Sequence, residues 1–201
     1  TSINIGMVCS ALKNGGTAEQ KAEWLPRLAA GEIASFGLTE PGSGSDSAAM
    51  QTMAVKSGNG WVLNGTKRYI TNSPFANVAL IMARTSKEAL PKNAHVSAFL
   101  VPMDTPGITV GKSDKKMGQA GSHIADIIME DVKLPADALL GGERAAMTLW
   151  FLAGYLKGLA DGNDLHSDDL RMVLKADGET VGEADEKLAR PPSRRRHDHQ
   201  G

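Results

Sequence analysis

The sequence has very little cysteine, few aromatic residues and no long hydrophobic run. Among its 201 residues, Cys9 is the single cysteine, so no disulfide can form within the chain, as is usual in a reducing compartment. Cys9 lies in an apolar stretch with helical character, which favours a buried structural thiol over a nucleophile. The longest apolar stretch, Ala145 to Leu156, is shorter than the ~20 residues that a membrane-spanning helix requires. We therefore expect no membrane span.

The chain also lacks a strong charge of either sign. Its 22 basic and 23 acidic residues leave a formal charge of −1, which argues against a nucleic-acid or membrane-surface role for the body of the protein. The cluster Arg194–Arg196 lies beside two prolines and is typical of a solvated tail. No signal peptide is visible, and the sequence starts without Met inside a helical pattern. We expect it to be a fragment.

Hydrophobic periodicity divides the chain into four regions. Residues 1–33 are predicted to be helical, and Thr17 with Gln20 forms the pattern of a capping box. Residues 34–135 contain many short strands with Gly and Pro turns, which indicates an antiparallel barrel or sandwich. Helical spacing returns in 136–160, and 161–201 is a charged, divergent and flexible tail. The predicted fold class is α+β: an antiparallel β-barrel domain flanked by helical segments.

Turn residues predict how the strands are connected. Asn64-Gly65 lies between two strand-like runs and predicts a two-residue hairpin there, since both turn positions favour positive φ. Residues 58–60, Gly-Asn-Gly, predict another turn just before it. The continuous apolar runs Val78–Arg84 and Val96–Val101 are typical of buried strands.

Two segments carry the residues best suited to a ligand site. Residues 38–46 read Leu-Thr-Glu-Pro-Gly-Ser-Gly-Ser-Asp and turn sharply after an apolar stretch. Glycine can adopt backbone conformations closed to other residues, so consecutive N–H groups there can converge on an anion. Residues 69–73, Tyr-Ile-Thr-Asn-Ser, place an aromatic ring and a hydroxyl at the end of a strand. Together the two segments suggest a site for a flat cofactor with a pyrophosphate tail.

Flavin binding requires three kinds of contact, and these segments can supply each of them. The amides of residues 42–45 can bind the pyrophosphate, and the hydroxyls of Thr39 and Thr71 can donate toward the reactive ring edge. Leu38 and Tyr69 offer an apolar face. Each feature alone is more often an ordinary loop, strand or packing residue, so the combination carries the argument.

The combination resembles the acyl-CoA dehydrogenases, which are FAD enzymes. Four blocks follow the family's order and spacing: residues 39–46, 67–72, 116–119 (Lys-Met-Gly-Gln) and 130–135 (Glu-Asp-Val-Lys-Leu-Pro). The likeness covers roughly residues 16–142. It implies that 1–33 ends an N-terminal helical domain and that 34–135 is a middle β-domain that binds FAD and acyl-CoA.

The resemblance also implies roles for individual residues around the flavin ring. Leu38 and Thr39 would contact the isoalloxazine, with Thr39 donating to its pyrimidine edge. Tyr69 would stack beside the ring, where many members of the family carry Trp. Thr71 would form a hydrogen bond near N5, the atom that receives the hydride.

Further implications concern the pyrophosphate, the substrate and the partners. Gly44 and Ser45 would meet the pyrophosphate, and Ser45 would also lie near the acyl-CoA. The family removes two hydrogens from the α and β carbons of an acyl-CoA thioester and passes electrons to an electron-transfer flavoprotein or similar acceptor. Full-length relatives are expected to be homo-oligomers, in the cytoplasm of bacteria or in the mitochondrial matrix of eukaryotes.

One part of the family pattern is not recognisable in this sequence. In most members a glutamate base comes from a C-terminal helical domain, but this chain diverges after Glu143. Glu179, Glu183 and Glu186 are more consistent with solvated side chains, and His123 with a surface or packing histidine. We assign no catalytic residue and no metal ligand, and we expect a fragment that lacks the base.

Two other functions remain open from the sequence. A flavin monooxygenase could share the fold and the β-domain motifs; reduced flavin would then drive oxygen consumption without acyl-CoA oxidation. A non-catalytic remnant that binds a nucleotide-like ligand would fit the missing base domain.

Overall fold

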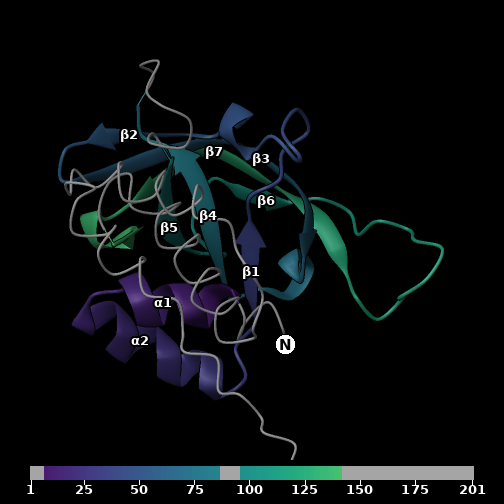
Figure 1. Cartoon of the computed structure of the whole chain (residues 1–201), viewed down its shortest axis with the longest axis horizontal. Helices are drawn as coiled ribbons and strands as arrows, with labels where there is room; N and C mark the ends of the chain where they lie inside the picture. Colours follow the sequence, from purple (N-terminus) through teal and green to yellow (C-terminus); the bar gives the residue numbers. More distant parts are fainter. Residues whose placement is uncertain (1–6, 87–95, 142–201) are drawn as a thin grey trace, which may run out of the picture. The chain divides into compact units, whose positions relative to one another are not determined.

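The computed structural model describes residues 7–86 and 96–141 (Figure 1). All of its helices and strands belong to one structural unit, Thr1–Gly154. Residues 142–160 of the predicted helical region, the tail at 161–201 and the three C-terminal glutamates lie outside the described residues. No helix in the described part of the chain has both the length and the apolar character needed to cross a membrane.

Two short helices precede the first strand, as the helical spacing predicts. They are α1 (Ser10–Gly15) and α2 (Ala18–Ala29), and they lie together on one side of the sheet (Figure 1). The Thr17 hydroxyl accepts a hydrogen bond from the Gln20 N–H at 3.2 Å, and Gln20 Oε1 accepts one from the Thr17 N–H at 3.0 Å. The predicted capping box is therefore confirmed.

Gln20 also connects α2 to the far end of the domain. Its side chain is buried, and Nε2 donates to the carbonyl oxygens of Asp137 at 2.6 Å and Leu139 at 3.0 Å. These residues belong to a 3₁₀ turn (Ala136–Ala138) and to β8 (Leu139–Leu140). One amide thus stabilises the start of the helix and the packing of a segment almost 120 residues away.

Gln20→Glu should destabilise the folded chain by about 2 kcal/mol or more. The carboxylate keeps an acceptor for the Thr17 N–H but loses both donors and brings a negative charge toward two buried carbonyl oxygens. Urea unfolding measures the change. Gln119→Glu, the same substitution at an exposed position, is the control and should shift the midpoint little. Equal midpoints for the two variants would show that the long-range bonds contribute nothing.

Eight strands form one sheet whose pairing path is open. The path runs β6-β7-β3-β2-β4-β5-β8, and β1 pairs in parallel with β4. The α+β prediction is confirmed, but the ladders among the described strands do not close into a barrel. Most strand pairs are antiparallel, whereas β4 pairs in parallel with β1 and β2. The bounds are β1 Ala34–Gly37, β2 Met53–Ser57, β3 Gly60–Thr71, β4 Val78–Arg84, β5 Val96–Pro102, β6 Ile108–Val110 and β7 Ile124–Leu134.

The predicted hairpin at Asn64-Gly65 is wrong. β3 continues through both residues, and the hairpin turn lies at Gly58-Asn59, where Ser57 pairs with Gly60. At Asn64 the register between β3 and β7 shifts instead. There the Asn64 side chain exchanges two hydrogen bonds with Asp131, which has a left-handed φ of 49°. Asn-Gly therefore accommodates a β-bulge between paired strands, which demands similar backbone freedom to a turn.

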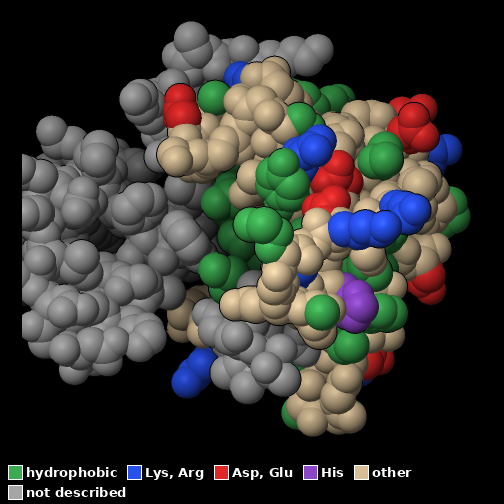
Figure 2. Space-filling view, turned by 90° about the vertical axis from the view of Figure 1, so that its right-hand side faces the viewer, with side chains coloured by type: hydrophobic (Ala, Val, Ile, Leu, Met, Phe, Trp, Pro, Cys, Tyr) green, Lys and Arg blue, Asp and Glu red, His purple; other side chains and the backbone are tan. Residues whose placement is uncertain are grey.

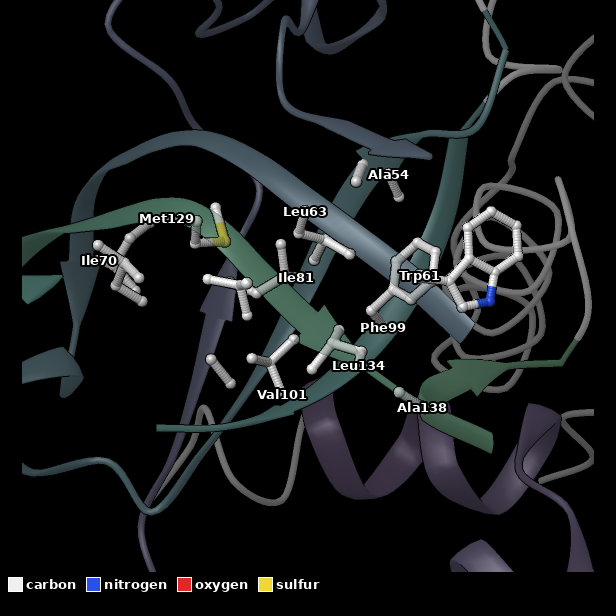
Figure 3. Close-up of a cluster of buried hydrophobic side chains, with 14 residues drawn as sticks. Ala54, Trp61, Leu63, Ile70, Ile81, Phe99, Val101, Met129, Leu134 and Ala138 are labelled. Atoms are coloured by element: carbon white, nitrogen blue, oxygen red, sulfur yellow. The ribbon is translucent and has the colours of Figure 1, made fainter. Parts of the chain in front are cut away.

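Side chains of β4 and β5 alternate between two hydrophobic clusters, so both strands are buried on both faces. One cluster includes Val78, Leu80 and Met82 and packs against residues of the helices such as Leu12 and Trp24. The other lies on the opposite face, where β3 and β7 cover β4 and β5 (Figure 3). This double burial explains the continuous apolar runs and confirms both predicted strands.

Candidate functional site

The segment that follows β1 is held as a closed loop by a single carboxylate. Glu40 is buried, and its two oxygens accept hydrogen bonds from the N–H groups of Gln51 at 2.5 Å and Thr52 at 3.0 Å. The backbone groups of Glu40 and Ser43 also bond to each other in both directions. Residues 41–50 therefore form a loop, called the 41–50 loop below, whose two ends are joined through Glu40.

The glycines of this loop are open rather than strained. Gly42 and Gly44 do not have positive φ, so the conformational reason that the sequence suggested for them is wrong. A Cβ built on either one would meet no atom of the described residues within 4 Å. Their lack of a side chain therefore leaves the backbone approachable from outside, which is the other reason for glycine in a binding loop.

The loop offers fewer amide donors than the sequence suggested. The Ser43 N–H is used within the loop, since it donates to Glu40 O at 3.2 Å. The amides of Gly44 and Ser45 make no backbone hydrogen bond within the described part of the chain, and both residues are exposed. The pair that the resemblance assigned to the pyrophosphate thus has amides available to an anion.

Tyr69 lies in a β-bulge that the sequence did not reveal. The register between β3 and β7 shifts between Lys67 and Ile70, and Tyr69 has a φ of 59°, a backbone conformation that is costly for a bulky residue. Asp126 on β7 stabilises it by accepting a hydrogen bond from the Tyr69 N–H at 3.2 Å. As a result the ring is 58% exposed instead of packed into the domain.

Arg68 orders the exposed ring from one side. Its guanidinium lies 4.9 Å from the centre of the Tyr69 ring and 3.7 Å from the Asp126 carboxylate. This arrangement of a cation against an aromatic face favours one orientation of the side chain. Tyr69 is thus presented at the surface as an apolar face.

Two hydrogen bonds bring the two predicted segments together. The Arg68 N–H donates to Thr39 O at 2.8 Å, and the Ser35 hydroxyl donates to Thr71 O at 3.0 Å. The chain from Ser35 to Thr39 therefore runs antiparallel beside the end of β3. The sequence prediction that Leu38 and Thr39 lie next to Tyr69 and Thr71 agrees with this pairing.

Thr39 and Thr71 are bonded through their backbones and keep their hydroxyls available. Both side chains are half-buried, and neither hydroxyl bonds to another described residue. Thr71 is the last residue of β3, and Thr39, which follows β1, is held by its backbone bond to Arg68. The two paired segments therefore provide two hydroxyl donors. The exposed Tyr69 follows Arg68, which bonds to Thr39, and precedes Thr71 by two residues.

Beneath this surface lies a buried ion pair, Glu40 with Lys67. The Lys67 side chain is fully buried, and its Nζ lies 2.6 Å from Glu40 Oε1. Burial by itself raises the pKa of Glu40, but the Lys67 ammonium and the hydrogen bonds outweigh it and the pKa falls below its ordinary 4.5. Burial lowers the pKa of Lys67. The ionised Glu40 carboxylate thus stabilises the fold above about pH 4.5, and this contribution is lost as the pH falls through the lowered pKa of Glu40, whereas the lowered pKa of Lys67 reflects the cost of burying its charge.

Neither member of this pair was predicted as a functional residue. Both occur in the blocks that carry the family resemblance, at positions 40 and 67, and that was the available signal. Sequence spacing could not pair them, because they are 27 positions apart and a loop, β2 and part of β3 lie between them.

The remaining polar candidates do not join the site. His123 is exposed and meets the Phe75 ring edge-on, with ring centres 4.8 Å apart, which agrees with a surface histidine. Cys9 is half-buried against the helix-side cluster, and burial raises the pKa of its thiol. That shift disfavours the thiolate and agrees with a structural role.

The surface of the described residues carries mixed charge. On the face drawn in Figure 2, basic, acidic and hydrophobic side chains lie interspersed, which fits the near-neutral sequence. A hollow lies at the other end of β3. It is lined by Ser57, by residues 59–62 and by residues 133–137. None of the six residues predicted to bind FAD lines it. The site rests on the strand pair and the 41–50 loop, not on this hollow.

Comparison with known proteins matches the strand region to one family. Residues 35–132 match the model of the acyl-CoA dehydrogenase middle domain. The human mitochondrial short-chain specific acyl-CoA dehydrogenase is 43% identical over 141 residues, which are 70% of this chain and 34% of that protein. The chain therefore spans about a third of the length of such curated relatives.

Solved structures agree with the match. A glutaryl-CoA dehydrogenase from Mycobacterium smegmatis in complex with FADH2 is 40% identical, with a TM-score of 0.62 over 71% of this chain and 36% of that one. An acyl-CoA dehydrogenase from Geobacillus kaustophilus is 28% identical, with a TM-score of 0.73 over 96% of this chain and 50% of that one. The fold and the order of the sequence blocks thus point to the same family.

Proposed function

Because the chain belongs to the acyl-CoA dehydrogenase family through residues 35–132, we propose that its strand pair and 41–50 loop form one wall of an FAD site. We further propose that the whole protein catalyses the α,β-dehydrogenation of an acyl-CoA thioester. As a member of this family, the chain is classed with oxidoreductases and flavoproteins. The observation that carries the proposal is the pair of available hydroxyls, Thr39 and Thr71, on neighbouring segments beside the exposed ring of Tyr69.

The donor set fits a flavin nucleotide in kind. The hydroxyls of Thr39 and Thr71 can donate to ring heteroatoms, and the free amides of Gly44 and Ser45 suit an anionic pyrophosphate. The open backbone at Gly42 and Gly44 permits close approach of such a group. Leu38 and Tyr69 supply apolar surface for a flat ring.

Each of these residues would have a defined task in catalysis. FAD, when bound, supplies a hydride acceptor for the β-carbon of the substrate. Thr71 would hold the ring by a hydrogen bond near the accepting atom, and Thr39 would do so at the pyrimidine edge. Tyr69 would cover part of the ring and exclude water. Ser45 would lie near the acyl-CoA.

Two carboxylates beside this wall, Glu40 and Asp126, are already engaged in hydrogen bonds. Glu40 accepts bonds from Lys67, Gln51 and Thr52, and Asp126 accepts from Tyr69. A base must be positioned and free to accept a proton. We propose that it comes from a C-terminal helical domain of the full-length protein, that this chain is a fragment without it, and that an electron-transfer flavoprotein reoxidises the flavin.

Thr71→Val should weaken FAD binding by about tenfold, since one hydrogen bond of ordinary strength is lost. Valine keeps the shape and the strand propensity of threonine, so the fold should be retained. The measurement is titration of the purified full chain with FAD, followed by flavin fluorescence and visible absorbance. Thr109→Val on β6 is the matched control, since Thr109 is exposed and the substitution is the same.

Two results would count against the proposed site, and two others would count against the proposed reaction. A folded wild-type chain that takes up no FAD would reject it, as would equal affinities for the Thr71 and Thr109 variants. A longer gene product that binds FAD but reduces no dye with any acyl-CoA would reject dehydrogenation. Oxygen consumption coupled to reduced flavin in that product would favour the monooxygenase instead.

A further inference from the structure

The ion pair of Glu40 and Lys67 bonds to the Leu38 carbonyl and to the end of the 41–50 loop. Lys67 Nζ donates to Leu38 O at 3.2 Å as well as to Glu40 Oε1 at 2.6 Å. The stem of Lys67 passes Gly37, where a Cβ would lie only 3.2 Å from Lys67 Cγ. A single ammonium group thus contacts the end of β1 and the start of the 41–50 loop.

On its other side, the Glu40 carboxylate reaches the end of the same loop. It accepts the N–H groups of Gln51 and Thr52 while Lys67 occupies Oε1. Three donors from two separate segments therefore converge on one carboxylate. The Glu40 carboxylate thus joins the two ends of the 41–50 loop, which presents Gly44 and Ser45. The Lys67 ammonium links this carboxylate to the Leu38 carbonyl.

Stability alone is a weak reason for such a pair. Removing two charges from water is costly, and buried pairs are often no more stabilising than apolar side chains of similar size. Directional bonds, in contrast, fix geometry in a way that apolar contacts do not. The hydrogen bonds that join this pair to the Leu38 carbonyl and to the N–H groups at the end of the loop therefore point to a role in geometry.

We propose that Glu40 and Lys67 are positioning residues, which hold the 41–50 loop and Leu38–Thr39 in the register needed to bind one flavin nucleotide. Neither residue touches the nucleotide. The pair acts through the Thr39 hydroxyl at one end and the amides of Gly44 and Ser45 at the other. The inference rests on the proposed FAD site for its ligand, but its effect on the loop is independent of any ligand.

The test replaces both charges together, so that no unpaired charge is left in the interior. In Glu40→Leu/Lys67→Met we expect a cooperative unfolding transition to persist, since the replacements are apolar and of similar volume. Amide hydrogen exchange at Gln51 and Thr52, measured without FAD, should become at least about tenfold faster, because both amides lose their acceptor. FAD binding should weaken by about tenfold or more.

Two comparisons make the result specific to the pair. Glu23→Gln removes an exposed partner of Arg27 and should change neither readout. Exchange at Phe99, which lies in β5 and pairs with β4 and β8 rather than with the loop, should stay unchanged in the double variant, since only the loop is released. If the double variant does not fold, Glu40→Gln is measured in its place; its single amide oxygen can accept only one of the two N–H groups, so exchange should become faster at Gln51 or Thr52 and FAD binding should weaken.

The outcomes separate this inference from the proposed function. Unchanged exchange at Gln51 and Thr52 in a folded variant would overturn the inference, and so would faster exchange with unchanged FAD affinity. Faster exchange together with weaker FAD binding supports it. If the wild-type chain takes up no FAD, the proposed function fails, and the exchange data alone decide whether the pair holds the loop.

Discussion

Replacing Phe99 by alanine should destabilise the folded chain by about 3–5 kcal/mol, as expected for a large side chain removed from a packed core. Phe99 is fully buried in β5, and its ring meets that of Trp61 edge-on, with ring centres 5.3 Å apart. The cluster in Figure 3 surrounds it with side chains from β3, β4 and β7. Alanine would leave a cavity at the point where these layers meet.

The matched control is Phe75→Ala, the same substitution at an exposed phenylalanine. Phe75 is 56% exposed, and its ring contact is with His123. Its loss should cost less than about 1 kcal/mol. Both variants are compared by urea unfolding with tryptophan fluorescence. A Phe99 variant as stable as the Phe75 variant would contradict the described core.

Gly65→Ala should destabilise the folded chain by about 2–4 kcal/mol, because it adds a clash to an unfavourable backbone conformation. Gly65 has a φ of +149°, and a Cβ there would lie 2.5 Å from Thr52 Oγ1 and 2.7 Å from Thr52 Cα. Thr52 is the residue whose N–H bonds to Glu40. A shift of Thr52 would therefore also disturb the end of the 41–50 loop.

Gly58→Ala separates the clash from the backbone cost. Gly58 also has positive φ, +57°, but a Cβ there would meet nothing within 4 Å among the described residues. This variant should cost only about 1 kcal/mol. Thermal unfolding gives both values. If Gly65→Ala proved no more destabilising than Gly58→Ala, the close approach of β3 to Thr52 would be rejected.

Local features of the fold could be predicted because their determinants are close in sequence. The capping box joins Thr17 to Gln20, three residues apart, and its formation needs no other part of the chain. The runs at 78–84 and 96–101 are apolar except for Arg84 and Ser97, which follows from burial on both faces. The ordered blocks likewise identified the family without any knowledge of contacts.

The site could be predicted only in part. Its residues were named by resemblance, and the neighbouring placement of residues 38–39 and 69–71 agrees with that assignment. The bulge at Tyr69 was not predictable, because it depends on Asp126, 57 residues further along. The sequence also did not predict that the Ser43 N–H is occupied, because this group donates to Glu40 O within the loop.

The sequence by itself determined the strand-forming segments, the helix start at Thr17 and the family of the chain, since each depends on residues near one another or on their order. Tertiary structure alone decided what Asn64-Gly65 does, because positive φ serves a turn or a bulge and the pairing of β3 with β7 selects the bulge. It also decided the tasks of Glu40 and Lys67. Their charges could only be placed by the fold, since burial requires each to find its partner 27 residues away.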